Sequence, residues 1–417
     1  CLHQLGRAEN SMLPDGWHRS TLGDCVELLT GYAFSSQAYA DASIPRVRLL
    51  RGDNVMQDTL RWNDAKHWAT PYGNELRRYE MQVGDIVIAM DRPITNAGLK
   101  CSIVRSHDLP CLLVQRVARM RTNDDLEQGY LAQVLQTHDF IQHLKGQKTE
   151  TAVPHISPND LRNFTIAYPK KEEQRRIARI LSTWDQAIAT TERLLANSHK
   201  QKDALTSALL TGTRRLRNRN AWMSTKLEKL IVESRILGSG GDTAKKITVK
   251  LYGRGVVGKT EKRLGSESTQ YYRRAAGQFI YSKLDFLNGA FGRVPEHLDE
   301  YESTLDLPAF DFLPGVDPRW FLYFVSREEF YLGHLGLANG GRKARRVNPA
   351  DLLRVSIQMP EFEEQKSIAN LLDTAQAEVA NFAGQLDMLR QQKVALMAQL
   401  LTGKRRVRLD AEATEAA

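Results

Sequence analysis

The chain has 417 residues, of which 42% are hydrophobic, an ordinary proportion for a globular protein. At typical domain sizes this length favours two to four domains over one. Lys and Arg outnumber Asp and Glu by 58 to 49, giving a formal net charge of +9. This sign is typical of proteins that meet phosphate backbones, although many basic proteins bind no nucleic acid.

Four cysteines, at positions 1, 25, 101 and 111, form no C-x-x-C pair and have no partnering histidine cluster. Neither a zinc site nor a disulfide framework is therefore indicated. No apolar run reaches the roughly 20 residues of a membrane span, and no signal peptide opens the chain. We expect a cytoplasmic protein with reduced thiols and no bound metal or cofactor of its own.

Along the chain, two stretches combine strand patterns with a helix pattern. Short apolar runs, two of them preceded by a Gly turn, predict strands, and longer periodic stretches predict helices. The expected strands are Arg46 to Leu50, Val83 to Ala89, Ile247 to Tyr252 and Ala276 to Ser282, and the expected helices are Leu126 to Leu144 and Pro318 to Leu332. These patterns predict two mixed, strand-rich domains.

The chain also contains an internal repeat. The motif Glu-Glu-Gln-x-x-Ile-Ala at residues 172–178 recurs at 363–369, and Leu-Leu-Thr-Gly-x-Arg-Arg at 209–215 recurs at 400–406. Both pairs share an offset of 191 residues, so no net insertion separates the copies over this stretch. Upstream, Trp17 and Leu22 resemble Trp222 and Leu227 at an offset of 205. Each half of the chain is thus a variable part followed by a fixed part.

Each fixed part has the heptad pattern of a long helix. About 38 residues at a rise of 1.5 Å make a rod on the order of 57 Å long. The apolar seam should be buried against the other copy, and length alone leaves both parallel and antiparallel pairing open. An ordinary homodimeric coiled coil is the alternative. The seam positions are Ile177, Leu181, Trp184, Ile188, Thr191, Leu195, Ser198, Lys202, Leu205 and Leu209, then Ile368, Leu372, Ala375, Val379, Phe382, Leu386, Leu389, Lys393, Leu396 and Leu400.

One motif matches a phosphate-binding loop. Residues 253–260 read Gly-x-x-x-x-Gly-Lys-Thr after a predicted strand. A true phosphate loop needs an apolar-faced helix directly after the Thr, yet residues 261–268 are polar and contain Gly265. We favour a turn that approaches a DNA backbone, with Lys259 supplying charge. Nucleotide hydrolysis is the enzymatic alternative.

Other catalytic patterns are missing from the sequence. No Asp-Pro-Pro-Tyr-like methyltransferase turn and no H-E-x-x-H motif occur, and the ten histidines lack metal-ligand spacing. His155 could be taken for a base, but a structural histidine is the favoured interpretation. The sequence indicates no active site.

Candidate DNA-binding residues form one set in each variable domain. Arg with Asn or Gln reads base edges, whereas Lys mostly holds phosphates. For any single residue a solvated surface charge is the safer interpretation. The first set is Arg46, Arg48, Arg51, Asn54, Arg92, Asn96, Lys100 and Lys148, and the second is Arg254, Lys259, Lys262, Arg263, Tyr271, Tyr272, Arg273, Arg342, Lys343, Arg345 and Arg346.

From Trp17 to about Val407 the chain resembles the specificity subunits of type I restriction-modification systems. The marks of this resemblance are the duplicated Glu-Gln-x-x-Ile-Ala at Gln174 and Gln365 and the duplicated Leu-Leu-Thr-Gly. A Pro-x-Asp-Leu precedes each helix, and the domains open with Trp17-x-x-x-x-Leu-Gly-Asp and Trp222-x-x-x-x-Leu. The second opening lacks the Gly-Asp.

The resemblance implies an α+β architecture in which two target-recognition domains are separated by an antiparallel pair of long helices, with an internal pseudo-twofold repeat. The expected parts are recognition domain 1 (12–170), spacer helix 1 (171–215), recognition domain 2 (216–361), spacer helix 2 (362–407) and a tail (408–417). Each domain would read one half of a split, asymmetric DNA sequence, and the chain itself would be non-catalytic.

The resemblance also implies partners. Two methyltransferase subunits would use S-adenosylmethionine to methylate adenine, and translocase/endonuclease subunits would use ATP and Mg. We expect the methyltransferase to dock on exposed helix faces near Gln174, Arg175, Arg179, Gln365 and Lys366. A coiled-coil scaffold without any DNA sequence preference is the structural alternative, although it has little use for two dissimilar domains.

Overall fold

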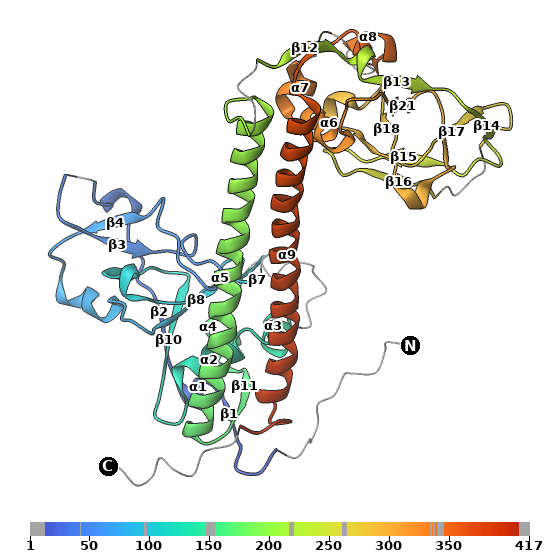
Figure 1. The fold of residues 1–417 in the computed structure, drawn as a ribbon. Coiled ribbons are helices and arrows are strands. Elements are labelled where there is room, and N and C mark those ends of the chain that lie inside the picture. The colour runs from blue at the N-terminus through green and yellow to red at the C-terminus, as the bar shows by residue number, and fades with distance from the viewer. Residues whose placement is uncertain are drawn as a thin grey trace. The chain divides into compact units, whose positions relative to one another are not determined.

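The computed structural model describes residues 13–41, 43–95, 98–146, 155–216, 221–260, 265–333, 336, 338–339 and 346–407. Two compact units make up the chain: Cys1–Thr191 with Gln385–Ala417, and Glu192–Gly384. Each unit combines one strand-rich region with part of each of two long helices (Figure 1). Both units mix strands and helices, which confirms the predicted α+β class.

The first unit contains two main sheets. An antiparallel sheet has the order β2 (Val26–Thr30), β10 (Val117–Thr122), β5 (Ile86–Ala89), β8 (Cys101–Ile103). A second has the order β4 (Lys66–Ala69), β3 (Arg46–Leu50), β9 (Cys111–Leu113), with β3 and β9 parallel. The first unit also contains two separate strand pairs, β1 (His18–Thr21) with β11 (Thr165–Tyr168) and β6 (Ile94–Thr95) with β7 (Gly98–Leu99).

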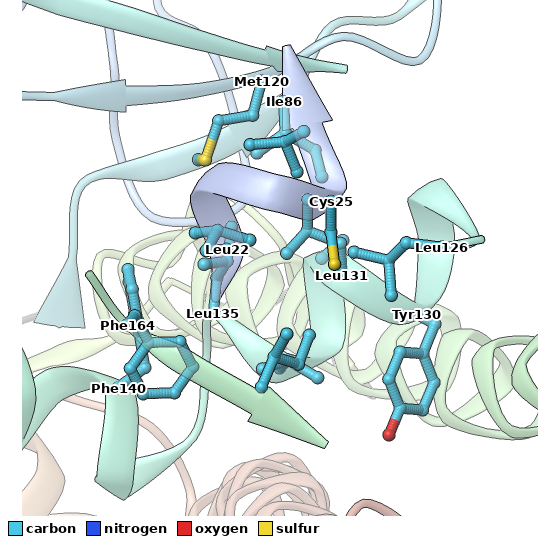
Figure 2. Close-up of a cluster of buried hydrophobic side chains, with 14 of the residues drawn as sticks. Leu22, Cys25, Ile86, Met120, Leu126, Tyr130, Leu131, Leu135, Phe140 and Phe164 are labelled. Atoms are coloured by element: carbon cyan, nitrogen blue, oxygen red, sulfur yellow. The ribbon is translucent and has the colours of Figure 1, made fainter. Parts of the chain in front are cut away.

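Short helices cover the strands of the first unit and bury its core. Figure 2 shows Leu22, Ile86, Met120, Tyr130 and Phe140 among the core side chains, all of them buried. The first long helix contributes Ile177 and Leu181 to this core, and the second contributes Met397, Leu400 and Leu401. Burying a Leu or Ile side chain stabilises a fold by about 1.5–3 kcal/mol, so these helix segments are held firmly within their unit. The helices are α1 (Leu22–Cys25), α2 (Gln128–Val134), α3 (His138–Lys145) and α4 (Pro158–Arg162), with 3-10 turns η1 (Ser36–Ala38), η2 (Asn74–Tyr79) and η3 (Ser106–Asp108).

The second unit repeats this plan with different strands. Its four-stranded sheet has the order β13 (Ile231–Ser234), β21 (Ala309–Phe312), β18 (Phe279–Tyr281), β19 (Phe291–Arg293). The pair β12 (Met223–Lys226) with β24 (Ser356–Met359) corresponds to β1 with β11. The remaining sheets are β14 (Leu237–Gly240) with β17 (Gln270–Arg273) and β20 (Glu302–Ser303), β15 (Ile247–Val249) with β16 (Val256–Gly258), and β22 (Ala338–Asn339) with β23 (Arg346–Val347).

The core of the second unit is rich in aromatic side chains. Trp320 and Phe321 are fully buried, and Phe279 packs edge-on against Phe321 with ring centroids 5.2 Å apart. Ile368 and Leu372 of the second long helix and Leu209 of the first join this core. Its helices are α6 (Pro318–Val325), α7 (Glu328–Gly333) and α8 (Pro349–Leu353), with 3-10 turns η4 (Leu227–Lys229), η5 (Phe286–Asn288) and η6 (Glu296–Leu298). The segment that opens the second domain forms the 3-10 turn η4, whereas the corresponding segment of the first domain forms the helix α1.

The two long helices are α5 (Lys171–Leu210) and α9 (Phe362–Leu400). Within each unit they run antiparallel, because Asp185 bonds Lys393 and Glu173 bonds Arg406 in the first unit, while Lys202 bonds Gln376 in the second. The predicted seam residues that are Ile, Leu or Val are all buried or half-buried. They are Ile177, Leu181, Ile188, Leu386, Leu389, Leu396 and Leu400 in the first unit, and Leu195, Leu205, Leu209, Ile368, Leu372 and Val379 in the second. None of the helices among the described residues is long and apolar enough to cross a membrane.

Two of the predicted helices are wrong as single elements. The stretch Leu126 to Leu144 is broken between α2 and α3 because the Thr137 hydroxyl donates to the Val134 carbonyl at 2.7 Å and accepts from the Phe140 N–H at 3.3 Å. Thr137 thereby caps the start of a new helix. The stretch Pro318 to Leu332 is likewise divided into α6 and α7.

Candidate nucleic-acid interface

Two buried glutamines join the long helices to the short helices of each unit. The Gln174 side-chain amide donates to the carbonyls of Pro169 and Asp125 at 2.8 and 2.9 Å, and its oxygen accepts from the Glu127 N–H at 2.8 Å. Gln365 makes the same three kinds of contact, with Pro360, Gly315 and Asp317.

Both glutamines are 0% exposed. The prediction that they lie on exposed docking faces is therefore wrong, because their amides are used to satisfy buried backbone groups. Of the other residues predicted near such a face, Arg175 and Arg179 are exposed and Lys366 is half-buried.

A buried carboxylate beside each glutamine pairs with the end of the other long helix. In the first unit Glu173 accepts from the Arg406 guanidinium at 2.8 and 2.7 Å. In the second unit Glu364 accepts from Arg215 at 2.9 and 2.7 Å. Burial would raise the pKa of the Glu364 carboxyl, but hydrogen bonds from Arg215, the Leu216 N–H and Trp222 lower it overall. The carboxylate therefore stays charged.

Three residues predicted to contact DNA have bonding partners within the first unit. Asn54 is 6% exposed, and its side chain holds a turn by bonding the Arg51 N–H and the Arg61 carbonyl, each at 2.9 Å. Arg48 lies over the Trp62 ring at 4.5 Å and donates to the Leu109 carbonyl at 2.9 Å. Arg46 donates to the Asp41 carbonyl at 2.6 Å. Because Asn54 is buried and its amide is already bonded, the prediction that it reads bases is wrong.

Three other candidates of the first unit come together. Lys100 interacts electrostatically with Asp53 and Arg92, and burial lowers its pKa. Arg51 pairs with Asp53 at 3.2 Å. Residues 51, 92 and 100 thus gather from three separate loops at one place on the unit. Asn96 and Lys148 lie outside the described residues.

The candidate DNA-binding residues of the second unit lie at several separate contacts. Arg273 pairs with Glu300 at 3.4 Å, the Arg274 guanidinium lies 5.7 Å from the centre of the Tyr272 ring, and the Lys246 ammonium lies 5.3 Å from that of Tyr271. Arg346 lies 3.8 Å from Asp306. Lys262, Arg263, Arg342, Lys343 and Arg345 lie outside the described residues.

The phosphate-loop-like segment is a β-hairpin turn. Strands β15 and β16 pair from Ile247 with Gly258 to Val249 with Val256, and Tyr252, Gly253 and Gly255 have positive φ angles of 57°, 65° and 80°. Arg254 lies in this turn, and Lys259 follows β16. Residues 261–264 are not described, and no helix is present from 265 to 269. The hairpin lacks the strand-to-helix geometry with which such loops bind phosphates, which argues against the nucleotide-hydrolysis alternative.

Each unit contains a hollow, and the residues that line the two hollows differ in charge. In the second unit a cavity of about 940 Å³ is lined by equal numbers of basic and acidic residues, namely Lys202, Arg293, Arg319, Arg327, Asp203, Glu296, Glu328 and Asp373. In the first unit a hollow of about 440 Å³ is lined by Asp91, Arg92, Arg116 and His155. Among the described residues no group of three or more His, Cys, Asp or Glu could hold a metal ion.

Comparison with known proteins shows similarity to one family. Residues 14–197 match the family model described as the type I restriction modification DNA specificity domain. The chain is 34% identical over 206 residues to the EcoAI specificity subunit of Escherichia coli. Over this part the chain is similar to the type I restriction enzyme specificity subunits. A second relative is the MjaVIII specificity subunit of Methanocaldococcus jannaschii, 27% identical over 215 residues.

These alignments cover 48% and 51% of this chain, but only 34% and 50% of the two relatives. Solved structures extend the similarity of fold to nearly the whole chain. The type I restriction-modification S subunit from M. genitalium matches 94% of this chain and 98% of its own, at a TM-score of 0.55 and 12% identity. A chain from a study of type I R-M complex assembly and conformational transition matches 95% of it and 100% of that chain, at a TM-score of 0.57 and 17% identity.

The sequence did not point to Arg116 as a residue of the hollow in the first unit, and His155 was interpreted as structural. One signal could have found His155, because the offset of the repeat, 191 residues, places it opposite Arg346, which was a candidate. Arg116 carried no such signal, since it lies in a part of the sequence where the two copies differ in length.

Proposed function

We propose that this chain recognises DNA within a type I restriction-modification enzyme, and that each of its two units reads one half of a bipartite, asymmetric target. The observation that carries the proposal is a contrast between the two units. The contacts by which the long helices support the units match, whereas the surfaces of the strand-rich regions differ. Gln174 and Gln365 make equivalent contacts at an offset of 191 residues, whereas the cations on the strand-rich regions differ between the units. Two unlike reading surfaces on matched supports suit a target with two unlike halves.

We propose further that the chain is non-catalytic and acts through partners. Two methyltransferase subunits would methylate adenine with S-adenosylmethionine, and restriction subunits would translocate and cleave DNA with ATP and Mg. Exposed Arg175 and Arg179, with half-buried Lys366, are the residues proposed to face the methyltransferase. Because methylation of an adenine in a duplex requires base flipping, the recognition surface has to accept opened or bent DNA.

The test is selection of DNA by the assembled complex. The chain is co-expressed with the methyltransferase of its own system, and bound duplexes are selected from a randomised pool with S-adenosylmethionine present. A gapped motif with two unlike halves at a fixed spacing is the expected result. The methyltransferase alone serves as the control and should select nothing. No enrichment by the complex, or one contiguous motif, would contradict the two-unit model.

A domain exchange shows which unit reads which half of the DNA target. Replacing residues 222–345 by the corresponding region of another specificity subunit should change one half of the selected motif and leave the other half intact. This region belongs entirely to the second unit. A change in both halves would show that the units do not read separately.

A further inference from the structure

The hollow of the first unit is organised around one carboxylate. Asp91 accepts a hydrogen bond from Arg116 at 2.6 Å through one oxygen and lies 2.7 Å from the His155 Nδ1 through the other. Burial would raise the pKa of the Asp91 carboxyl, but the hydrogen bonds from Arg116 and His155 lower it overall. Asp91 therefore holds both side chains in place as a carboxylate. Within the described part of the chain the His155 Nε2 has no hydrogen-bond partner, so it can meet a ligand.

The surroundings of Asp91 carry excess positive charge. Arg92 also lines the hollow, and Lys100 interacts with Asp53, Asp91 and Arg92. A Cβ atom built on Gly52 would lie 4.0 Å from the Arg116 carbonyl, so the turn that holds Arg51 and Asp53 packs beside it. The cations Arg51, Arg92, Lys100 and Arg116 outnumber the carboxylates Asp53 and Asp91 even before His155 is protonated. Such a group favours an anion.

The backbone at Arg92 is also unusual. Its φ angle is 44°, in the left-handed region, which costs a non-glycine residue about 1–3 kcal/mol. The side chain is exposed at the rim of the hollow. This conformation presents a guanidinium, the group best suited to bind phosphate oxygens in pairs.

The fold of the second unit contains a position equivalent to this hollow of the first unit. In the first unit the Met90 N–H donates to Arg116 at 2.8 Å and the Met90 carbonyl accepts from Ile156 at 2.9 Å. In the second, Lys283 makes the matching bonds with Asp306 and Val347 at 2.9 and 3.0 Å. His155 thus corresponds to Arg346, and Arg116 corresponds to Asp306.

Each unit therefore places a basic side chain beside a carboxylate at this position, His155 with Asp91 and Arg346 with Asp306. The charge of Arg346 is permanent, whereas an imidazole gains its charge only as the pH falls. The two equivalent positions therefore differ in whether the charge of the basic side chain depends on pH.

We propose that Arg92, Arg116 and His155 form a binding site for a DNA phosphodiester in the first unit, and that His155 contributes to it only when protonated. The inference rests on the proposed function, because it takes duplex DNA as the ligand. Phosphate contacts set the register of a protein on DNA and weaken with salt. Protonated His155 would donate from Nε2 to a phosphate oxygen while Asp91 compensates the charge at Nδ1. The groups facing His155 are Asp91, Arg92 and Arg116, with Lys100 and Asp53 beyond them.

The experiment measures the Kd of the chain with its methyltransferase for the selected duplex at about pH 5.5 and about pH 8, spanning the usual titration of histidine. The wild-type complex should bind roughly three to ten times more tightly at the lower pH, the range of one exposed charge-assisted contact. His155→Ala should remove most of this ratio, and His155→Arg should give tight binding at both pH values.

Arg346→His is the matched variant in the second unit. It should weaken binding at about pH 8 and recover it at about pH 5.5, so that the pH ratio exceeds that of the wild type. Arg116→Ala should weaken binding at both pH values and reduce the slope of log K against log salt by about 0.9.

The inference would be overturned if His155→Ala folded normally and kept the wild-type pH ratio, or if His155→Arg bound no better than His155→Ala at about pH 8. In either case, specific binding by the wild type would leave the proposed function intact. If the wild-type complex showed no preference for any duplex, the proposed function itself would fail.

Discussion

The guanidinium of Arg406 donates two hydrogen bonds to the carboxylate of Glu173, 233 residues earlier in the chain. Arg215 and Glu364 form the same pair in the other unit, 149 residues apart. In both units the end of one long helix is tied to the beginning of the other. The Leu-Leu-Thr-Gly-x-Arg-Arg motif is thus explained by its last arginine, which neutralises a buried carboxylate.

Removing either arginine should destabilise its unit. The Glu173 side chain is 3% exposed, so Arg406→Ala leaves an unpaired charge that cannot be hydrated without rearrangement. We expect a loss of about 2 kcal/mol in the free energy of unfolding, measured by urea denaturation, because a buried polar group has lost its partner. Arg405→Ala, at the exposed neighbouring position, is the control and should change stability by less than about 0.5 kcal/mol. Equal effects of the two variants would contradict the assigned role.

The Glu364 carboxylate should make stability depend on pH. Its pKa in the folded chain lies below the ordinary value of 4.5. Its contribution is therefore present above that value and is lost as the pH falls through the folded-state pKa. Urea midpoints measured down to about pH 3 should fall less steeply for Glu364→Gln than for the wild type, although the variant is less stable at neutral pH. Parallel pH profiles would show that another group dominates.

Gln174→Ala should loosen the start of α2. The substitution leaves the Glu127 N–H and the carbonyls of Pro169 and Asp125 without their partner, at a cost of about 2–3 kcal/mol. Hydrogen exchange at the Glu127 amide should accelerate more than the loss of global stability predicts. Gln365→Ala is the matched variant, with its effect at the Asp317 amide instead. Acceleration at both amides in each variant would contradict local anchoring.

The polar contacts between the long helices should differ in strength. Lys393 has a side chain that is 8% exposed and bonds both Asp185 and Gln136, whereas the contact of Lys202 with Gln376 is exposed. Asp185→Ala should therefore cost more stability than Gln376→Ala, by at least about 1 kcal/mol, because it leaves a buried ammonium. Urea denaturation of both variants provides the comparison. A larger loss for Gln376→Ala would reverse the interpretation.

Local pattern was enough to predict the long helices but not the breaks in the short ones. The seam of α5 and α9 follows a heptad period over dozens of residues, so a few polar positions do not obscure it. The stretch from Leu126 to Leu144 has a similar apolar period, yet it is interrupted where Thr137 bonds the backbone. One side chain that competes for backbone hydrogen bonds outweighs the periodicity of a short segment.

The sequence by itself determined the internal repeat, the two long helices and their seam, because each of these is a pattern of neighbouring residues. Only the tertiary structure decided that Gln174 and Asn54 are buried and that Arg92, Arg116 and His155 share one hollow. These residues are brought together by strand pairing across long stretches of chain, and the spacing of polar residues in a sequence does not encode which of them will meet.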